Sequence, residues 1–276
     1  MHAGTPSHAT PPVSTLAPAD LDAYLRRIGC GRPGRADLAA LRALHTAHVG
    51  AIPFENLDVR WGRGVALDLP ALVAKLVRGG RGGYCFEHNG LFAAALRALG
   101  FAVTPLGARV RYGATRVLPR THHLLLVDLP GERCVVDVGF GAQTLLEPVP
   151  LRADRTFAQA AWRYRLVRED ALWVLRIAEG DAWTDLYAFT LEPQAQADLE
   201  MANWYVSTHP ASRFVRTLTV QRATPQARHL VRDREYTIDR GGGNVVTRAI
   251  ADDEWPALLR DALALDLAPG TPLPLP

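Results

Sequence analysis

Cysteine is scarce in this sequence. Only Cys30, Cys85 and Cys134 occur among 276 residues, too few for a disulfide framework in a chain of this size. No two of them have the close spacing of a structural zinc site, so we expect no metal. Sparse, unpaired thiols are typical of a reducing compartment, which predicts a cytoplasmic protein.

Long apolar runs and a large excess of charge are also missing. The most apolar stretch, 91–108, is interrupted by Arg97 and Pro105, so it predicts no membrane span. The net charge is only +3 and the arginines are scattered, which argues against a nucleic-acid or membrane partner. Residues 1–17 lack a basic start followed by an apolar core, so we expect a flexible leader and not a signal peptide.

The hydrophobic periodicity changes along the chain. Apolar residues at helical spacing in the first third predict four helices, at 21–28, 38–48, 70–79 and 85–99. Short segments rich in Val and Leu then predict strands at 101–111, 123–129, 134–138, 162–167, 172–178, 183–189, 214–221 and 229–237, followed by an amphipathic helix at 253–265. Helices followed by strands and a mixed tail indicate an α+β protein.

Cys85 has an unusual setting. The glycine-rich segment GGRGG at 79–83 leads into the helix that Cys85 begins. The positive end of a helix dipole stabilises a thiolate, and glycines let a substrate approach the backbone. A nucleophile and a buried core cysteine both fit this position. A phosphate-binding loop is excluded because no Gly-Lys-Ser/Thr follows.

A nucleophilic thiol needs a base, and His88, His122 and His123 are the candidates. The segment after His123 leads through Pro130-Gly131 into a second strand that ends near Asp137. If those two residues form the loop of a hairpin, His122 shares a face with Asp137 at a diagonal distance of about 7 Å. His123 then points to the other face, whereas a three-residue loop would reverse the two.

Asp137 follows Cys-Val-Val in an apolar strand. A carboxylate there needs a partner, or its pKa is displaced. Orienting a catalytic base is one role for it, and ending the strand before the Gly139–Gly141 loop is the other.

Several motifs of the sequence resemble those of arylamine N-acetyltransferases. In order along the chain they are IPFENL at 52–57, RGGYCFE at 81–87, THHLLLV at 121–127, VDVGFG at 136–141 and STHP at 207–210 with SRF at 212–214. The resemblance extends over about 18–265. It implies an N-terminal helical bundle, a central β-barrel, a C-terminal α/β lid and a Cys-His-Asp triad like that of cysteine proteases. We place these parts at 18–100, 101–205 and 206–276, after the leader at 1–17.

Carried over by position, the motifs imply that Cys85 is the nucleophile, His122 the base and Asp137 the acid. Backbone N–H groups of Cys85 and Thr121 are then candidate oxyanion donors. Residues that resemble the substrate-binding ones of the family are Phe54, Phe140 and Gly141, although plain core packing also explains the two phenylalanines.

The implied reaction is a ping-pong acetyl transfer from acetyl-CoA, as co-substrate, to an arylamine, arylhydrazine or N-hydroxyarylamine, in xenobiotic metabolism. Two other functions use the same residues. One is a thiol hydrolase, for which the papain signature is missing, and the other is a non-catalytic binding protein with an ordinary thiol. The natural acceptor, the preferred acyl chain length and the oligomeric state stay open.

Overall fold

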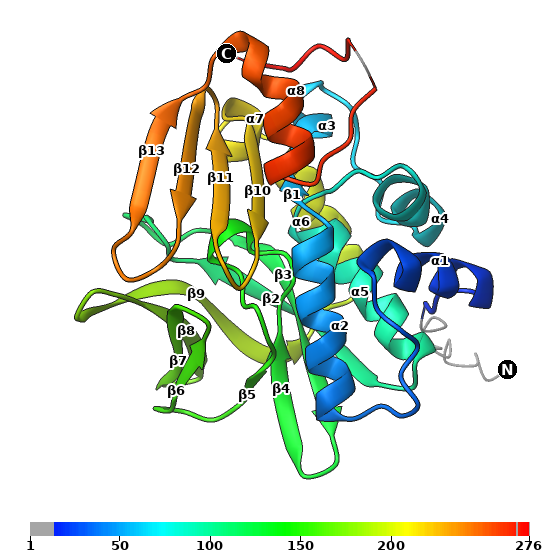
Figure 1. The fold of residues 1–276 in the computed structure, drawn as a ribbon. Helices are drawn as coiled ribbons and strands as arrows, with labels where there is room; N and C mark the ends of the chain where they lie inside the picture. Colours follow the sequence, from blue (N-terminus) through cyan, green and yellow to red (C-terminus); the bar gives the residue numbers. More distant parts are fainter. Residues whose placement is uncertain (1–13, 269, 276) are drawn as a thin grey trace, which may run out of the picture.

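The computed structural model describes residues 14–268 and 270–275, so most of the predicted leader lies outside the described residues. Helices from the first third of the chain lie beside a long curved sheet, and a second sheet lies above it (Figure 1). Helices and sheets occupy separate parts of the molecule, which confirms the predicted α+β class.

The helical part supplies one long element that matters for the site. Helix α5 (Cys85–Ala98) is buried along most of its length among the other helices and the sheet. The others are α1 (Pro18–Ile28), α2 (Leu38–Ala51), α3 (Leu57–Arg60) and α4 (Leu69–Leu72), which continues into a wider π-helical turn at Val73–Arg78. Asp37 and Asp68 are the N-cap residues of α2 and α4, because each carboxylate accepts a backbone N–H of the first turn. All four predicted helices are present.

The larger sheet has eight strands in the order β5-β4-β3-β2-β9-β8-β7-β6 and curves into a nearly closed, barrel-like shape. Its bounds are β2 (Ala102–Val110), β3 (Arg120–Leu129), β4 (Glu132–Val136), β5 (Val149–Pro150), β6 (Thr156–Gln159), β7 (Trp162–Glu169), β8 (Leu172–Glu179) and β9 (Ala182–Pro193). Apolar side chains of this sheet and of the helices form one continuous core. The middle third is therefore β-structure, as predicted.

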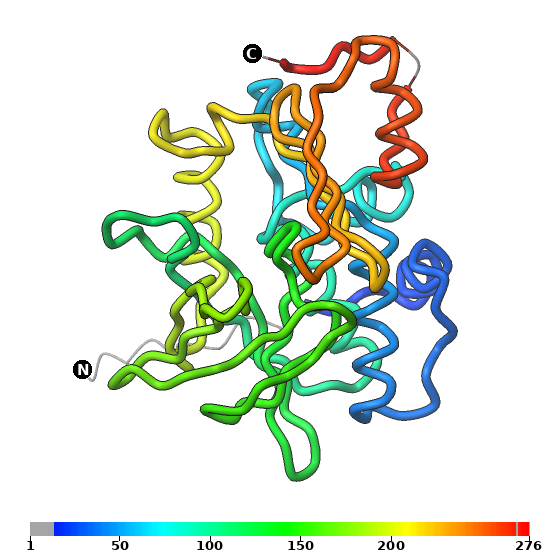
Figure 2. The backbone as a smooth tube through the Cα atoms, turned by 60° about the vertical axis from the view of Figure 1, so that its left-hand side comes forward, coloured from blue at the N-terminus to red at the C-terminus, as the bar shows by residue number. Residues whose placement is uncertain are grey.

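The second sheet combines one strand from the first third of the chain with strands from the last third. Its order is β1-β10-β11-β12-β13, and β1 (Phe54–Glu55) comes from between the early helices. The remaining strands are β10 (Thr219–Ala223), β11 (Arg228–Arg232), β12 (Glu235–Asp239) and β13 (Val245–Ala249). Figure 2 shows this sheet next to the C-terminal turns, which comprise a 3-10 turn (Asp252–Glu254), α8 (Trp255–Ala257) and a π-helical turn (Leu258–Ala262).

Three predictions for the last third need correction. The predicted strand 214–221 begins instead as a short helix, α7 (Arg213–Arg216), because the Ser212 hydroxyl accepts the N–H of Phe214 and caps it. The predicted strand 229–237 is a hairpin of two strands that turns at Asp233, whose φ is 49°. Helix α6 (Gln196–Thr208) was not predicted, and it spans the position where the sequence places the boundary at 205.

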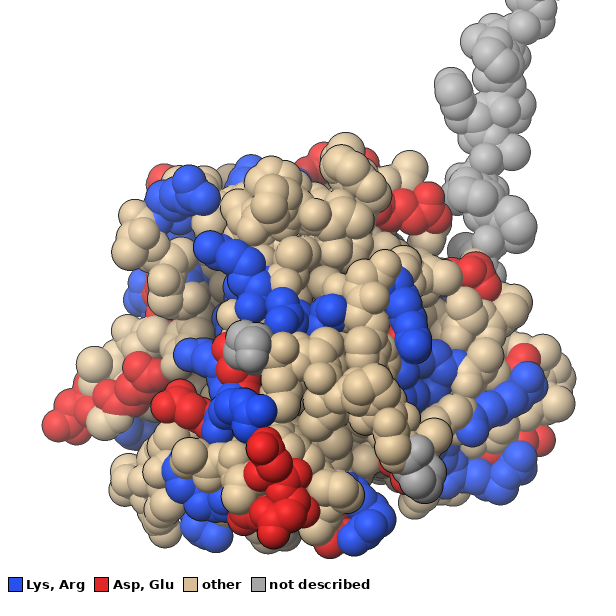
Figure 3. Space-filling view, turned by 90° about the horizontal axis from the view of Figure 1, so that it is seen from above, with Lys and Arg blue, Asp and Glu red and all other residues tan. Residues whose placement is uncertain are grey.

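The charge distribution on the surface and the character of the helices bear on whether a nucleic acid or a membrane is a partner. Basic and acidic side chains are interspersed on the face in Figure 3. Among the described residues, none of the helices combines the length and the apolar character that a bilayer crossing requires.

Candidate active site

Cys85 is the first residue of α5, and its side chain is buried. The carboxylate of Glu87 accepts the N–H of Tyr84 at 3.0 Å, which stabilises the first turn of the helix. The Cys85 thiol donates to the carbonyl oxygen of Thr121 at 3.8 Å across the gap to β3. The nucleophile candidate therefore lies at the positive end of the α5 dipole, next to the start of β3.

The predicted hairpin register is confirmed. Leu129 lies opposite Glu132 and Leu125 opposite Val136, so Pro130-Gly131 is the two-residue loop. The His122 ring therefore reaches Asp137, with Nε2 at 2.8 Å from Oδ2. His122 Nδ1 remains for Cys85, whose sulfur is close enough to this ring to raise the pKa of His122.

Asp137 is fully buried and has several donors. Its Oδ1 accepts the side-chain amide of Asn89 and the N–H of Gly139, both at 3.0 Å. Burial alone raises the pKa of Asp137, but His122 and these donors outweigh burial and hold that pKa below its usual value. Asp137 is therefore a carboxylate held in place by three partners.

The charge of His122 follows from the same contacts. Burial lowers its pKa, but Asp137 and then Cys85 outweigh this and raise the pKa to about 10. His122 is consequently an imidazolium at neutral pH, and its positive charge lies beside the Cys85 sulfur.

The two other candidate bases have different surroundings. His123 points away from Asp137 and stacks on Phe86, and burial lowers its pKa to about 3. His88 is bonded through Nε2 to the carbonyl of Pro53 at 3.0 Å and through Nδ1 to His48 at 2.9 Å. Of the three, only His122 combines contacts to Cys85 and a carboxylate.

The predicted substrate-binding residues lie around the same position. Phe140 contacts the His122 ring edge-on at 4.9 Å, and Tyr187 completes this aromatic cluster at 4.8 Å from His122. Phe54 lies over the His88 ring at 6.2 Å. Gly141 has φ of +80°, and a Cβ there would overlap the Gln221 side chain.

Gly139 explains how the VDVGFG loop comes so close to α5. A Cβ at this position would lie 2.9 Å from the Cα of Cys85 and 2.9 Å from the Asn89 amide nitrogen. Only a residue without a side chain fits there without displacing the helix or the loop.

Among the described residues, no three His, Cys, Asp or Glu side chains are grouped as a metal site would need.

A protein family model described as N-acetyltransferase matches residues 37–271. The arylamine N-acetyltransferase of Mycolicibacterium smegmatis is 46% identical over 230 residues, which cover 81% of this chain and 83% of the relative. The solved Nocardia farcinica arylamine N-acetyltransferase superposes with a TM-score of 0.87 at 40% identity, covering 93% of this chain and 94% of that one.

This chain belongs to the arylamine N-acetyltransferase family. It is therefore an acyltransferase, as the motifs predicted. Another similar structure is the Mycobacterium marinum arylamine N-acetyltransferase in complex with CoA, with a TM-score of 0.84 at 38% identity over 89% of this chain and 92% of that chain.

Sequence reasoning missed two residues of this arylamine N-acetyltransferase site. Asn89 lies four residues after Cys85, on the same face of α5, and bonds Asp137, the carbonyl of His123 and the N–H of Val138. Its helical spacing from Cys85 is a signal that could have found it. Gln221 accepts the N–H of Ala142 from the second sheet, a contact for which the sequence carries no signal.

A buried chain of hydrogen bonds through Tyr24, His48 and His88 links α1, α2 and α5. Tyr24 bonds His48 Nδ1 at 2.8 Å, and His48 Nε2 bonds His88 Nδ1 at 2.9 Å. Because the Pro53 carbonyl only accepts, His88 Nε2 must carry its hydrogen, so His48 donates to His88 and accepts from Tyr24. This chain of hydrogen bonds requires both rings to be neutral. Burial lowers the pKa of both, that of His88 to about 4.

We expect the acid sensitivity of the fold to depend on these rings. The histidines of the unfolded chain take up protons below pH 6.5, their ordinary pKa. In the folded protein His88 takes up a proton only near pH 4, and burial likewise holds the pKa of His48 well below 6.5. Stability is therefore lost as the pH falls, by about 2 kcal/mol per histidine between pH 7 and pH 5. In urea titrations at both pH values, His48→Phe should lose about 2 kcal/mol less than the wild type between them. Equal losses in the two proteins would show that His48 is already charged in the folded state.

Proposed function

We propose that this enzyme transfers an acetyl group from acetyl-CoA to arylamines, arylhydrazines or N-hydroxyarylamines through an acetyl-cysteine at Cys85. One observation carries the proposal. The Cys85 thiol, at the start of α5, contacts a buried His122 whose other ring nitrogen lies 2.8 Å from Asp137. This is the arrangement that nucleophile, base and orienting acid require. The names of the relatives supply arylamines and N-hydroxyarylamines as substrate classes. Arylhydrazines come from the family resemblance of the motifs.

In the first half-reaction, the Cys85 thiolate attacks the thioester carbonyl of acetyl-CoA and forms a new carbon–sulfur bond. The bond to the CoA sulfur breaks, and the His122 imidazolium gives its proton to that sulfur, so CoA leaves as a thiol. Asp137 keeps the ring oriented and stabilises its charged form. Backbone N–H groups of Cys85 and Thr121 are the proposed donors to the oxyanion that forms in between.

In the second half-reaction, the nitrogen of the amine attacks the acetyl-cysteine. Neutral His122 takes the amine proton, the thiolate of Cys85 leaves, and the starting ion pair is restored. An N-hydroxyarylamine can use its oxygen in the same way. Phe54 and Phe140 offer aromatic faces to an aryl acceptor, and Gly141 lets the adjoining loop pack against Gln221.

Mass spectrometry of the intact protein tests this sequence of steps. Acetyl-CoA alone should add the mass of one acetyl group to Cys85 and release one equivalent of CoA. Adding aniline should remove the adduct, produce acetanilide and make CoA release continuous. Cys134→Ser is the matched control, because that thiol is buried in β4 and should carry no adduct.

Two outcomes would contradict the proposal. Continuous CoA release without any amine would show that water is the acceptor, as in a thiol hydrolase. An acetyl group on a residue other than Cys85 would reassign the nucleophile. The scarce thiols suit a reducing compartment, so we also propose a cytoplasmic location.

A further inference from the structure

A cavity lies on the outside of the barrel-like sheet. Its volume is about 610 Å³, and the ends of β2 and β9 line it together with the connection between β2 and β3. Cys85, His122 and Asp137 are not among its lining residues. Four arginines are, at 109, 111, 116 and 120, and Asp185 is the one acidic lining residue.

A β-bulge separates this cavity from the catalytic candidates. Ala108 lies opposite His122, but the next residue, Arg109, lies opposite Arg120, so Thr121 has no partner on β2. Neighbouring residues of a strand point to opposite faces, and cross-strand partners share a face. Arg109 and Arg120 therefore project from the face opposite His122. The extra residue turns Arg120 away from the thiol and into this cavity.

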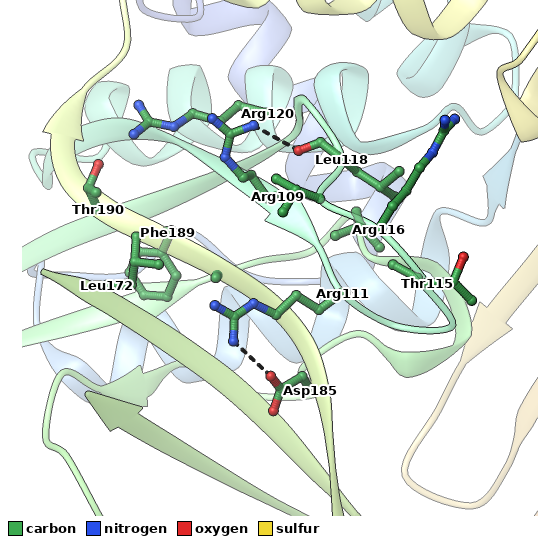
Figure 4. Close-up of a pocket in the computed structure, with 14 residues that line it drawn as sticks. Arg109, Arg111, Thr115, Arg116, Leu118, Arg120, Leu172, Asp185, Phe189 and Thr190 are labelled. Carbon is green, nitrogen blue, oxygen red and sulfur yellow. Dashed lines mark hydrogen bonds and ion pairs between the residues drawn. The ribbon is translucent and has the colours of Figure 1, made fainter. Parts of the chain in front are cut away.

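Several of these guanidinium groups are available to a ligand. Arg111 is held by Glu169 at 2.6 Å and Asp185 at 2.9 Å. Arg109 bonds only the carbonyl of Leu118, and within residues 14–268 and 270–275 neither it nor Arg116 forms an ion pair. Figure 4 shows these side chains around the cavity, with Arg111 paired to Asp185 and Arg109 bonded to Leu118.

The fourth arginine is only weakly held. Arg120 pairs with Glu192 at 3.0 Å, but the Glu192 side chain is 66% exposed. Exposed ion pairs contribute little free energy, so an incoming anion can replace Glu192. Arg109, Arg116 and Arg120 together can thus offer three guanidinium groups to one ligand.

The rest of the lining is apolar. Leu172, Ala188 and Val110 are among the lining residues. Ala188 is the cross-strand partner of Arg109 and belongs with Leu172 to a small apolar cluster. The volume lies within the range of small-molecule sites. A guanidinium group can donate two hydrogen bonds at once to a phosphate, and apolar side chains pack well against a flat ring. The ligand that fits has several negative charges at one end and a planar apolar group at the other.

We propose that this cavity binds a nucleotide that carries at least two phosphate groups, with the phosphates on Arg109, Arg116 and Arg120 and the base against Leu172 and Ala188. Two sources supply this chemistry. One is a free nucleotide, and the other is the nucleotide end of an acyl-CoA donor. Only the second source depends on the proposed function.

Calorimetric titration with adenosine 3′,5′-bisphosphate tests the site. We expect saturable binding to the wild type that weakens with added salt, and binding about ten-fold weaker to Arg116→Glu. The side chain of Arg116 is exposed in a connection, so the variant should fold normally. Arg133→Glu is the matched control, since Arg133 is exposed on β4 outside the cavity. Leu172→Trp should also weaken binding, by filling the apolar end without a change of charge.

Absence of saturable binding to the wild type would overturn the proposal. Equal affinity of the wild type, Arg116→Glu and Leu172→Trp would also overturn it, because the ligand would then bind elsewhere.

Steady-state kinetics then identify the source. If the acyl donor places its nucleotide here, Arg116→Glu should raise the KM for acetyl-CoA about ten-fold and leave acetylation by p-nitrophenyl acetate, which has no nucleotide, unchanged. If a free nucleotide is the ligand, the KM for acetyl-CoA should stay at the wild-type value while nucleotide binding weakens. Both results support the site. Failure of both donors to acetylate Cys85 in the wild type would refute the proposed function and leave the titration result intact.

Discussion

Replacing Cys85 by Ser should abolish acetyl transfer while the fold remains intact. The thiol makes one weak hydrogen bond, to the Thr121 carbonyl at 3.8 Å, so little stability is at stake. A serine hydroxyl stays protonated near neutral pH, and the His122 imidazolium beside it is no base. Loss of the nucleophile should therefore lower kcat/KM by at least about a thousand-fold.

The measurement combines an activity assay with thermal melting, because the variants should lose activity without losing stability. Cys85→Ser and Cys85→Ala should melt within a few degrees of the wild type, and neither should gain an acetyl group from acetyl-CoA. Cys134→Ser should behave in the opposite way. That side chain is fully buried among apolar residues of β4, so a hydroxyl there should cost about 1–3 kcal/mol of stability and leave kcat nearly unchanged. An acetylated Cys85→Ala would refute the assignment of the nucleophile.

The contact between His122 and Asp137 is predictable from sequence because its determinants are local. Pro130-Gly131 is a strong turn signal, and a two-residue loop determines which side chains of the flanking strands share a face. The choice of His122 over His123 follows from that register alone. The placement of Cys85 at the start of α5 is similarly local, since glycines precede it and an apolar helical stripe follows.

Contacts across long stretches of chain are not predictable in this way. The pairing of Phe54 with Gln221 joins residues far apart in sequence, and no periodic pattern in either segment specifies its partner. The bulge at Thr121 depends on how β2 and β3 align, which the alternation of side chains does not reveal. The turn at Asp233 was missed because it contains neither Gly nor Pro, although Asp tolerates positive φ better than most residues.

Neighbouring histidines with opposite surroundings provide the second decisive comparison. His122→Ala removes the group that contacts both Cys85 and Asp137, and leaves the buried carboxylate without its cationic partner. We expect a loss in kcat/KM of about a thousand-fold or more. His123→Ala removes a ring that stacks on Phe86 and points away from the thiol. Its loss should appear as about 2–4 kcal/mol of stability, with activity per folded molecule within a few-fold of wild type.

His123→Phe separates packing from chemistry. Both ring nitrogens of His123 lack a hydrogen-bond partner within the described part of the chain, so a phenyl ring should restore the lost stability at little cost. His122→Phe should restore none of the activity, because a phenyl ring neither moves a proton nor pairs with Asp137. Initial rates and urea midpoints for the four variants make this comparison. If His123→Ala proved the less active variant per folded molecule, the base would have to be reassigned to His123, and a ring buried on the far face of β3 would have to reach the sulfur.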